Sequence, residues 1–167
     1  MRTSNRRPRA LLVVLGAALA LMTVVAPVGA ATPQQVNIVS HMTFPGNAPN
    51  YGTFEATGSA VENGLICERG TVLDTKYVVG GWQSGRAVQI LVRKQFTCTD
   101  ENGIPDGSGT FVVKIQVHAA FDGTETFSWI VQGGTGAYED LRGAGNGVTV
   151  DPTPTGNTNI YDGFLVQ

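Results

Sequence analysis

The sequence predicts an all-β fold: a single antiparallel barrel of roughly eight strands that follows an N-terminal signal peptide. Three observations support this prediction. Apolar and polar residues alternate with a period of two along most of the chain after residue 30, glycine-rich turns separate the alternating segments, and helical periodicity is nearly absent. Strands at such short spacing are typical of a barrel or a sandwich. A closed barrel is favoured, because long strands in an open sheet leave exposed edges.

The first 30 residues predict an export signal that is removed. Four arginines and no acidic residue lie in the first nine positions, and an apolar run from Ala10 to Ala26 follows. Small residues at 28–30 predict cleavage after Ala30, with cleavage after Ala31 as an alternative. An uncleaved anchor is disfavoured because the run is shorter than the roughly 20 residues of a spanning helix. Arg6-Arg7 leaves twin-arginine export open. We therefore predict a signal peptide at 1–30 and a secreted barrel domain at 31–167, with no membrane association after cleavage.

The charge of the predicted mature chain excludes one class of partner. The whole chain holds 11 basic and 13 acidic residues, which give a net charge of −2. Cleavage after residue 30 removes four arginines and no acid, so seven basic residues remain against 13 acidic ones and the net charge becomes −6. Nucleic acids and anionic membranes bind positive surfaces. We therefore expect neither as a partner.

The alternation predicts about eight strands in the order of the chain. The clearest is a long strand at 110–122, in which Phe111, Val113, Ile115 and Val117 share one face. The strand at 88–98 has a similar apolar face that only Lys94 interrupts. The predicted strands are 36–44, 53–60, 70–79, 88–98, 110–122, 126–132, 145–150 and 158–166.

Turn residues separate these strands. Glu62-Asn63-Gly64, Gly80-Gly81, Asp122-Gly123 and Gly133-Gly134 each lie between two alternating runs. The longest connections are Thr99–Gly109 and Asp151–Gly156, whose Asp, Asn, Gly and Pro residues predict loops.

The two cysteines of the chain, Cys67 and Cys98, predict a disulfide, since an isolated pair in an exported protein is most simply a cross-link. The alternatives are a metal pair or a reactive thiol. A metal site needs His or further Cys at short spacing, and the sequence offers neither.

The most distinctive run of the chain is Gly133-Gly134-Thr135-Gly136-Ala137-Tyr138-Glu139-Asp140-Leu141-Arg142-Gly143-Ala144-Gly145. It resembles the late-strand signature of allene oxide cyclase-like and dirigent-like barrels, which are calycin-like in architecture. A Trp-bearing strand precedes the run and a Tyr-containing terminal strand follows it. The resemblance implies the barrel fold, a lumen that accepts small apolar molecules, and a possible homo-oligomer. Only the glycine-rich run aligns with those families, so their catalytic residues are not carried over to this sequence and the catalytic residues remain unknown.

The same residues have a structural interpretation. Gly133, Gly134 and Gly136 permit the positive φ of a tight turn, and Gly143 permits close approach of the backbone. We expect Tyr138 and Leu141 to pack at a barrel end, and Arg142 to pair with an acid or to cap carbonyl groups. A phosphate-binding glycine loop is the alternative, but it needs a following helix.

Side chains that could carry a reaction are few. The sequence holds no GxSxG, HExxH or Walker-type motif, and we predict no cofactor. His41 and His118 lie on the polar sides of their strands, which indicates surface residues. The carboxylates that could act as general acids or bases in a lumen lie in or beside strands. They are Glu55, Glu62, Asp74, Glu139 and Asp140. Positions at strand ends or at the rim are favoured for them. Glu62 and Asp74, however, stand where the alternation otherwise places apolar residues and could point inward.

Two further features of the sequence could bind a ligand. Asp100, Asn102 and Asp106 resemble part of a calcium loop, but they lack the EF-hand spacing, so a solvated loop is favoured and no metal is predicted. Trp82 lies in a glycine-containing turn and could stack on a ligand, but a side chain folded over the barrel end is the more common case.

Three functions remain compatible with the sequence. The favoured one is a non-enzymatic secreted barrel that binds a small apolar ligand or serves as a stable extracellular module. The residues that we expect to line such a lumen are Phe127, Trp129 and Tyr138. The second is a cofactor-free cyclase, isomerase or coupling guide that uses the lumen, and the third is a cell-envelope interaction protein.

Overall fold

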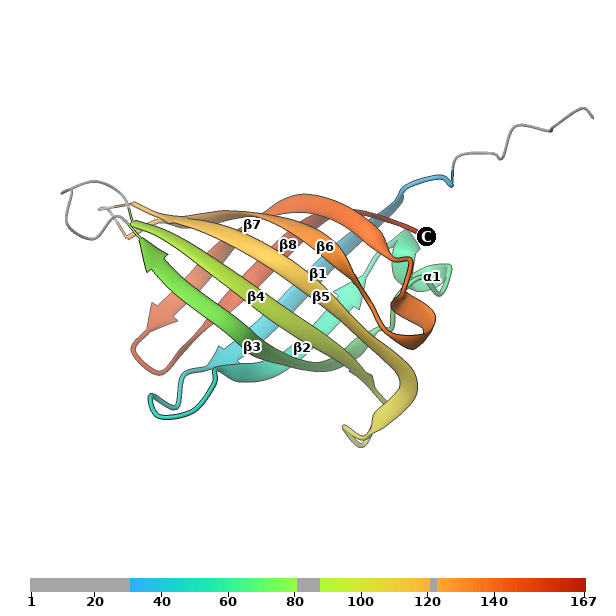
Figure 1. Ribbon diagram of the computed structural model, residues 1–167, viewed down its shortest axis with the longest axis horizontal. Coiled ribbons are helices and arrows are strands. Elements are labelled where there is room, and N and C mark those ends of the chain that lie inside the picture. Colours follow the sequence, from blue (N-terminus) through green and yellow to red (C-terminus); the bar gives the residue numbers. More distant parts are fainter. Residues whose placement is uncertain (1–30, 81–87, 121–122) are drawn as a thin grey trace, which may run out of the picture. The chain divides into compact units, whose positions relative to one another are not determined.

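The computed structural model describes residues 31–80, 88–120 and 123–167, which form one compact unit. Eight antiparallel strands close into a barrel in which each strand pairs with its neighbour in sequence, and the first strand pairs with the last (Figure 1). The strands are β1 (Gln34–Thr43), β2 (Tyr51–Thr57), β3 (Arg69–Gly80), β4 (Val88–Thr99), β5 (Pro105–Ala119), β6 (Glu125–Gly134), β7 (Arg142–Thr153) and β8 (Gly156–Val166). The predicted all-β barrel is confirmed.

Two short helices lie between strands. Helix α1 (Ser59–Glu62) follows β2, and the 3₁₀ helix η1 (Gly136–Tyr138) follows β6. The predicted strand at 53–60 is therefore wrong at its end. Gly58 adopts a φ of +103°, which carries the chain out of the sheet after Thr57, and Ser59 and Ala60 belong to α1. Within the described residues, no helix is long and apolar enough to span a membrane.

The alternating apolar faces meet inside the barrel. Seven aromatic rings form a continuous cluster in which each ring contacts at least one other. Phe96 and Phe111 stack with ring centroids 4.9 Å apart, and Tyr161 touches Phe127 at the same distance. The members are Phe54, Phe96, Phe111, Phe127, Trp129, Tyr138 and Tyr161. This cluster fills much of the interior with side chains, as in other small barrels.

Glycines on β7 and β8 make room for the largest of these rings. A Cβ atom on Gly145 would lie 2.7 Å from the Trp129 ring and 2.0 Å from the Asp162 carbonyl oxygen, and one on Gly147 would lie 2.3 Å from the Phe127 ring. A side chain at either position would overlap backbone and ring atoms together. The close approach expected for Gly143 is also present, since its Cβ would lie 2.5 Å from the Phe164 carbonyl oxygen.

Candidate functional site

The two ends of the barrel differ. At one end lie α1, η1, the C-terminus and the hairpin between β4 and β5 (Figure 1). At the other end lie the connections from β1 to β2 and from β7 to β8. The first end is closed by buried side chains, whereas the second holds a cavity.

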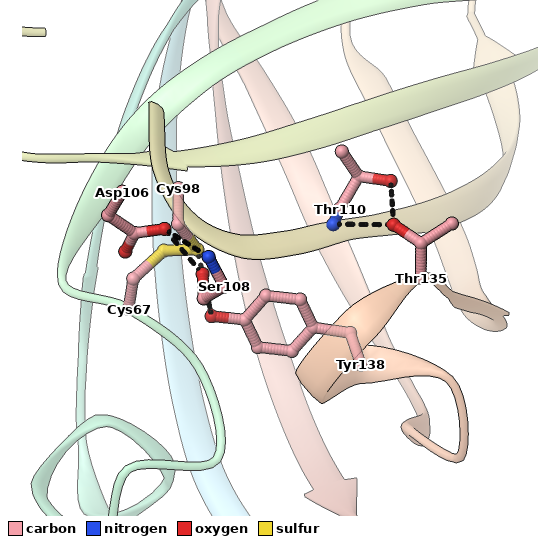
Figure 2. Close-up of a disulfide and its surroundings, with 7 residues drawn as sticks. All are labelled: Cys67, Cys98, Asp106, Ser108, Thr110, Thr135 and Tyr138. Carbon is pink, nitrogen blue, oxygen red and sulfur yellow. Dashed lines mark hydrogen bonds between the residues drawn. A yellow bond between two sulfur atoms is a disulfide. The ribbon is translucent and has the colours of Figure 1, made fainter. Parts of the chain in front are cut away.

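The closed end is built around the disulfide. Cys67 and Cys98 are joined, as the sequence predicted, and Cys98 is fully buried. The Tyr138 hydroxyl lies 3.0 Å from Cys98 Sγ and 3.1 Å from Ser108 Oγ (Figure 2). Because the single Ser108 hydroxyl proton is donated to Asp106 at 2.6 Å, the Tyr138 hydroxyl is the donor toward Ser108. Tyr138 therefore ties η1 to the disulfide and to β5.

The glycine-rich run forms this end rather than a ligand loop. Gly133 and Gly136 have the positive φ values that were expected, +99° and +60°, but Gly133 and Gly134 both still belong to β6, where the register with β5 shifts. The following helix η1 has three residues. Arg142 Nη1 donates to the carbonyl oxygens of Leu141, at 2.8 Å, and Glu139, at 3.3 Å. Capping of carbonyl groups by Arg142 is thus confirmed.

The open end contains a cavity of about 150 Å³. One wall is apolar and comes from the inner faces of β4, β5 and β6, which contribute Ile90, Val92, Ile115, Val117 and Phe127. The other wall is mainly polar and comes from the β1–β2 connection and from β7 and β8, which contribute Phe44, Asn50, Thr149, Pro152, Thr153, Asn157 and Asn159. Tyr77 and Glu125 also line the cavity.

A buried ion pair, Asp74 and Lys94, lies in the lining of this cavity. Lys94 Nζ donates to Asp74 Oδ1 at 2.6 Å, and the two residues are 5% and 8% exposed. Asp74 Oδ2 accepts a second hydrogen bond from Asn50 Nδ2 at 2.9 Å. Charges this deeply buried are rare unless they are paired. Both carboxylate oxygens of Asp74 thus accept a hydrogen bond, whereas Lys94 has one acceptor among the described residues for its three N–H donors.

The pair exists because Asp74 and Lys94 are direct partners across β3 and β4. Immediately beyond them the register shifts between Asp74 and Lys76, so Thr75 is an extra residue in β3. This bulge exchanges the two faces of the remainder of β3. Lys76 pairs with the exposed Arg93, and Tyr77 pairs with the buried Val92 and lines the cavity. Bulges of this kind often occur beside functional sites, where they redirect a side chain.

The polar wall is a hydrogen-bonded network of its own. Thr149 Oγ1 donates to Asn159 Oδ1 at 3.0 Å, and Asn159 Nδ2 donates to Asn157 Oδ1 at 3.1 Å. Asn159 is 6% exposed. These bonds fix the amide orientation on the side of the cavity that faces the apolar wall of β4, β5 and β6.

The surroundings shift the protonation equilibria of the lining residues. Burial lowers the pKa of Lys94 below its ordinary value, and the neighbouring Asp74 carboxylate offsets this only in part. The pKa of Tyr77 is raised by its partial burial and then by the charges of Glu125 and Asp74. The pKa of Tyr161, deep in the barrel, is raised chiefly by burial. Burial therefore favours the neutral forms of Lys94, Tyr77 and Tyr161.

Two buried hydroxyls near this site, Ser40 Oγ and the Tyr161 hydroxyl, have no partner in good hydrogen-bond geometry among the described residues, and Ser40 is the polar group that acts on the Tyr161 hydroxyl and opposes the effect of burial on its pKa. Replacement of Tyr161 by Phe keeps the ring contacts and removes this one weak polar interaction. We expect Tyr161→Phe to change the free energy of unfolding by less than about 1 kcal/mol in urea titrations. The exposed Tyr51→Phe is the matched control, and a loss of more than about 1 kcal/mol in Tyr161→Phe would contradict the expectation.

The three residues that the sequence predicted to line a lumen lie in different places. Phe127 is buried and lines the cavity. Trp129 is buried in the aromatic cluster, where its Nε1 donates to the Asn146 carbonyl oxygen at 3.1 Å. Tyr138 belongs to the closed end. Of the three, Phe127 is the one that the structure places beside Lys94 and Asp74 in the cavity lining.

The other candidate residues are mostly at the surface. His41 and His118 are exposed, as expected, and His41 Nδ1 lies 3.0 Å from Thr158 Oγ1. Four of the five candidate acids are exposed: Glu55, Glu62, Glu139 and Asp140. Asp74 is the exception, and the favoured placement at a strand end or rim is wrong for it. The bulge and the pairing with Lys94 hold its carboxylate inside the barrel.

In the loop that resembles part of a calcium site, Asp100 forms hydrogen bonds with the backbone of the loop itself. Asp100 Oδ1 accepts from the backbone N–H groups of Asn102 and Ile104, each at 2.9 Å. The Ile104 bond is the main cause that lowers the pKa of Asp100. β5 already begins at Pro105, so the predicted loop at 99–109 is too long. Within the described ranges, His, Cys, Asp and Glu form no group that could hold a metal ion. Trp82 lies outside the described residues.

Sequence reasoning noted Lys94 but did not recognise it as a site residue. The available signal was its position, since Lys94 stands where the alternation of β4 demands an inward apolar residue. Its partner could not be identified from the sequence, because the pairing of β3 with β4 depends on their register. In the comparisons with known proteins, no family model and no curated protein matches this chain.

Proposed function

We propose that this protein is a secreted small-molecule-binding barrel whose ligand occupies the cavity at the open end. The observation that carries the proposal is the composition of the cavity lining. An apolar wall from β4, β5 and β6 faces a hydrogen-bonding wall, and the lining includes the buried ammonium of Lys94, which has one acceptor among the described residues. Pockets with an apolar lining and a few well-placed polar groups are typical of small-molecule sites.

The lining limits the chemistry of the ligand. About 150 Å³ corresponds to roughly five liquid-water volumes, so the ligand, or the part of it that enters, is small. Its apolar body would lie against Ile115 and Phe127. A carbonyl or hydroxyl oxygen would accept a hydrogen bond from Lys94. Because Asp74 already compensates Lys94 and Glu125 adds a negative charge, the cavity favours a neutral ligand over an anionic one.

Three further features support the proposal. The glycine-rich run resembles that of allene oxide cyclase-like and dirigent-like barrels, which accept small apolar molecules in a barrel pocket. The export signal expected at 1–30 and the Cys67–Cys98 disulfide are both compatible with a protein that acts outside the cell. The apolar ligand expected from the sequence is replaced in the proposal by one with a polar head, because Lys94 and Asp74 lie in the lining.

The proposal is tested with 4-fluorophenol, which has an apolar ring and one hydroxyl. We expect its ¹⁹F signal to broaden on addition of the purified, oxidised protein, with a Kd of about 1 mM, since a ligand of this size gains roughly 0.5 kcal/mol per non-hydrogen atom. Ile90→Trp, which places a large ring in the cavity lining, is expected to weaken binding about tenfold or more.

Leu91→Trp is the matched control, because Leu91 is the next residue of β4 and is 41% exposed on the outer face. It is expected to bind 4-fluorophenol like the unmodified protein. Absence of broadening with the unmodified protein would overturn the proposal. Equal binding by Ile90→Trp would place the ligand elsewhere and would contradict the proposed site.

A further inference from the structure

Lys94 differs from the other lysines of the barrel. The chain contains three lysines, and Lys76 and Lys114 are exposed on the outer face, whereas Lys94 is 5% exposed and lines the cavity. A buried amine that borders a ligand cavity can react with a ligand as well as carry a charge. The neutral amine is a nucleophile toward carbonyl carbon, and burial is one of the ways in which proteins favour that form.

Asp74 offers a place for the proton that the amine must lose. The Nζ and Oδ1 atoms are 2.6 Å apart, so one proton transfer along this hydrogen bond converts the ion pair into a free amine and a carboxylic acid. No solvent molecule is needed for this transfer. The low-polarity surroundings of Ile115, Val92 and Phe127 favour the neutral pair relative to its balance in water. The burial that lowers the pKa of Lys94 acts in the same direction.

We infer that Lys94 forms an imine with a small aldehyde or ketone that enters the cavity at the open end of the barrel. The inference rests on the proposed function, since it assumes that this cavity admits a ligand, and it names the carbonyl compounds as the ligand class. In this role Lys94 is the nucleophile, and Asp74 holds and returns the proton.

Imine formation begins with a proton transfer inside the ion pair. Lys94 transfers one proton to Asp74, and its lone pair forms a bond to the carbonyl carbon while the carbonyl π electrons move to oxygen. The nitrogen proton and the oxygen charge combine to give a neutral carbinolamine. Asp74 then protonates the hydroxyl group, the C–O bond breaks, water leaves, and loss of the remaining nitrogen proton to the Asp74 carboxylate gives the imine. The net change is amine plus carbonyl compound to imine plus water, with Asp74 regenerated as the acid.

The remaining lining supports this chemistry. Asn50 Nδ2 donates to Asp74 Oδ2 and keeps Oδ1 directed at Lys94. The apolar wall shields the imine carbon from bulk water, which would otherwise reverse the reaction. Among the residues that the structure describes, the titratable groups that face the cavity besides this pair are Tyr77 and Glu125. Glu125, which is half-buried, disfavours negative charge near the carbonyl oxygen.

The experiment is reductive trapping. The oxidised protein is incubated at neutral pH with butanal and sodium cyanoborohydride, and the butylated positions are mapped by peptide mass spectrometry. Burial lowers the pKa of Lys94, so a larger share of its amine is neutral at neutral pH than for an exposed lysine. We therefore expect Lys94 to be butylated severalfold faster than Lys76 and Lys114, which serve as internal controls. Labelling of Lys94 no faster than that of the two exposed lysines would overturn the inference.

Variants separate this inference from the proposed function. Lys94→Arg keeps a cation beside Asp74 but cannot form an imine, so it should lose the fast labelling. Lys76→Arg is the matched control and should keep the fast labelling. Excess 4-fluorophenol should slow labelling of Lys94 in the unmodified protein. If 4-fluorophenol binds in the cavity and Lys94 stays unlabelled, the imine inference fails alone. If neither occurs, the proposed function fails as well.

Discussion

Replacement of Asp74 by alanine is expected to lower the free energy of unfolding by about 3–5 kcal/mol. The loss arises from the positive charge of Lys94, which remains in the variant. Lys94 is 5% exposed, and Asp74 is its acceptor at 2.6 Å, so the variant leaves an uncompensated ammonium inside the barrel. Asn50 also loses the acceptor for its side-chain amide. Urea unfolding at neutral pH measures the loss.

The control for Asp74→Ala is Glu55→Ala, which removes an exposed carboxylate from the neighbouring strand β2 and should change stability by less than about 0.5 kcal/mol. The double variant Asp74→Leu with Lys94→Met replaces the pair by apolar side chains. It should recover most of the stability that Asp74→Ala loses, because no unpaired charge remains. A cost below about 1 kcal/mol for Asp74→Ala would show that Lys94 reaches solvent when Asp74 is absent.

Removal of the disulfide by the double variant Cys67→Ala with Cys98→Ala is expected to cost about 3–4 kcal/mol. The cross-link joins residues 31 positions apart, and in the oxidised protein it restricts the unfolded chain. The Tyr138 hydroxyl also loses the contact with Cys98 Sγ at the closed end. Urea unfolding of the double variant and of the oxidised protein gives the difference.

Reduction of the unmodified protein is the control for this prediction. It should add the mass of two hydrogens and should lower the urea midpoint toward that of the double variant. A difference below about 1 kcal/mol between the oxidised protein and the double variant would contradict the prediction. It would mean that α1, η1 and the aromatic cluster hold the closed end without the cross-link.

The strands were predictable because each has one face in the core and one outside, so the alternation survives in the sequence. Phe111, Val113, Ile115 and Val117 are all buried in β5, as their spacing predicted. The ends of the strands were less predictable. β5 starts at Pro105, where Gly107 and Gly109 adopt positive φ, and such residues are read from sequence as a loop.

The candidate site was less accessible to sequence reasoning than the fold. The side of β3 that borders the cavity depends on a bulge at Thr75, and simple alternation would have turned Lys76 rather than Tyr77, which is 53% exposed, toward the cavity lining. The Asp74–Lys94 pair depends on the register between two strands, which a single sequence does not encode locally. Lys94 is visible in the sequence as an interruption of an apolar face. Its role in a buried ion pair can be recognised only when Asp74 is known to lie opposite it. Phe127 was identified because an aromatic residue on an apolar face is expected inside a barrel.

The pairing of β1 with β8 sets the order in which the barrel can form. Gln34 lies opposite Leu165, so the barrel closes only when the two ends of the domain meet. A chain that is made from its N-terminus presents β1 first and β8 last. Until β8 is present, β1 and β7 are both open edges of the sheet. Folding dominated by such distant contacts is slow, on the order of milliseconds to seconds. This topology therefore delays closure of the barrel until its last strand is available.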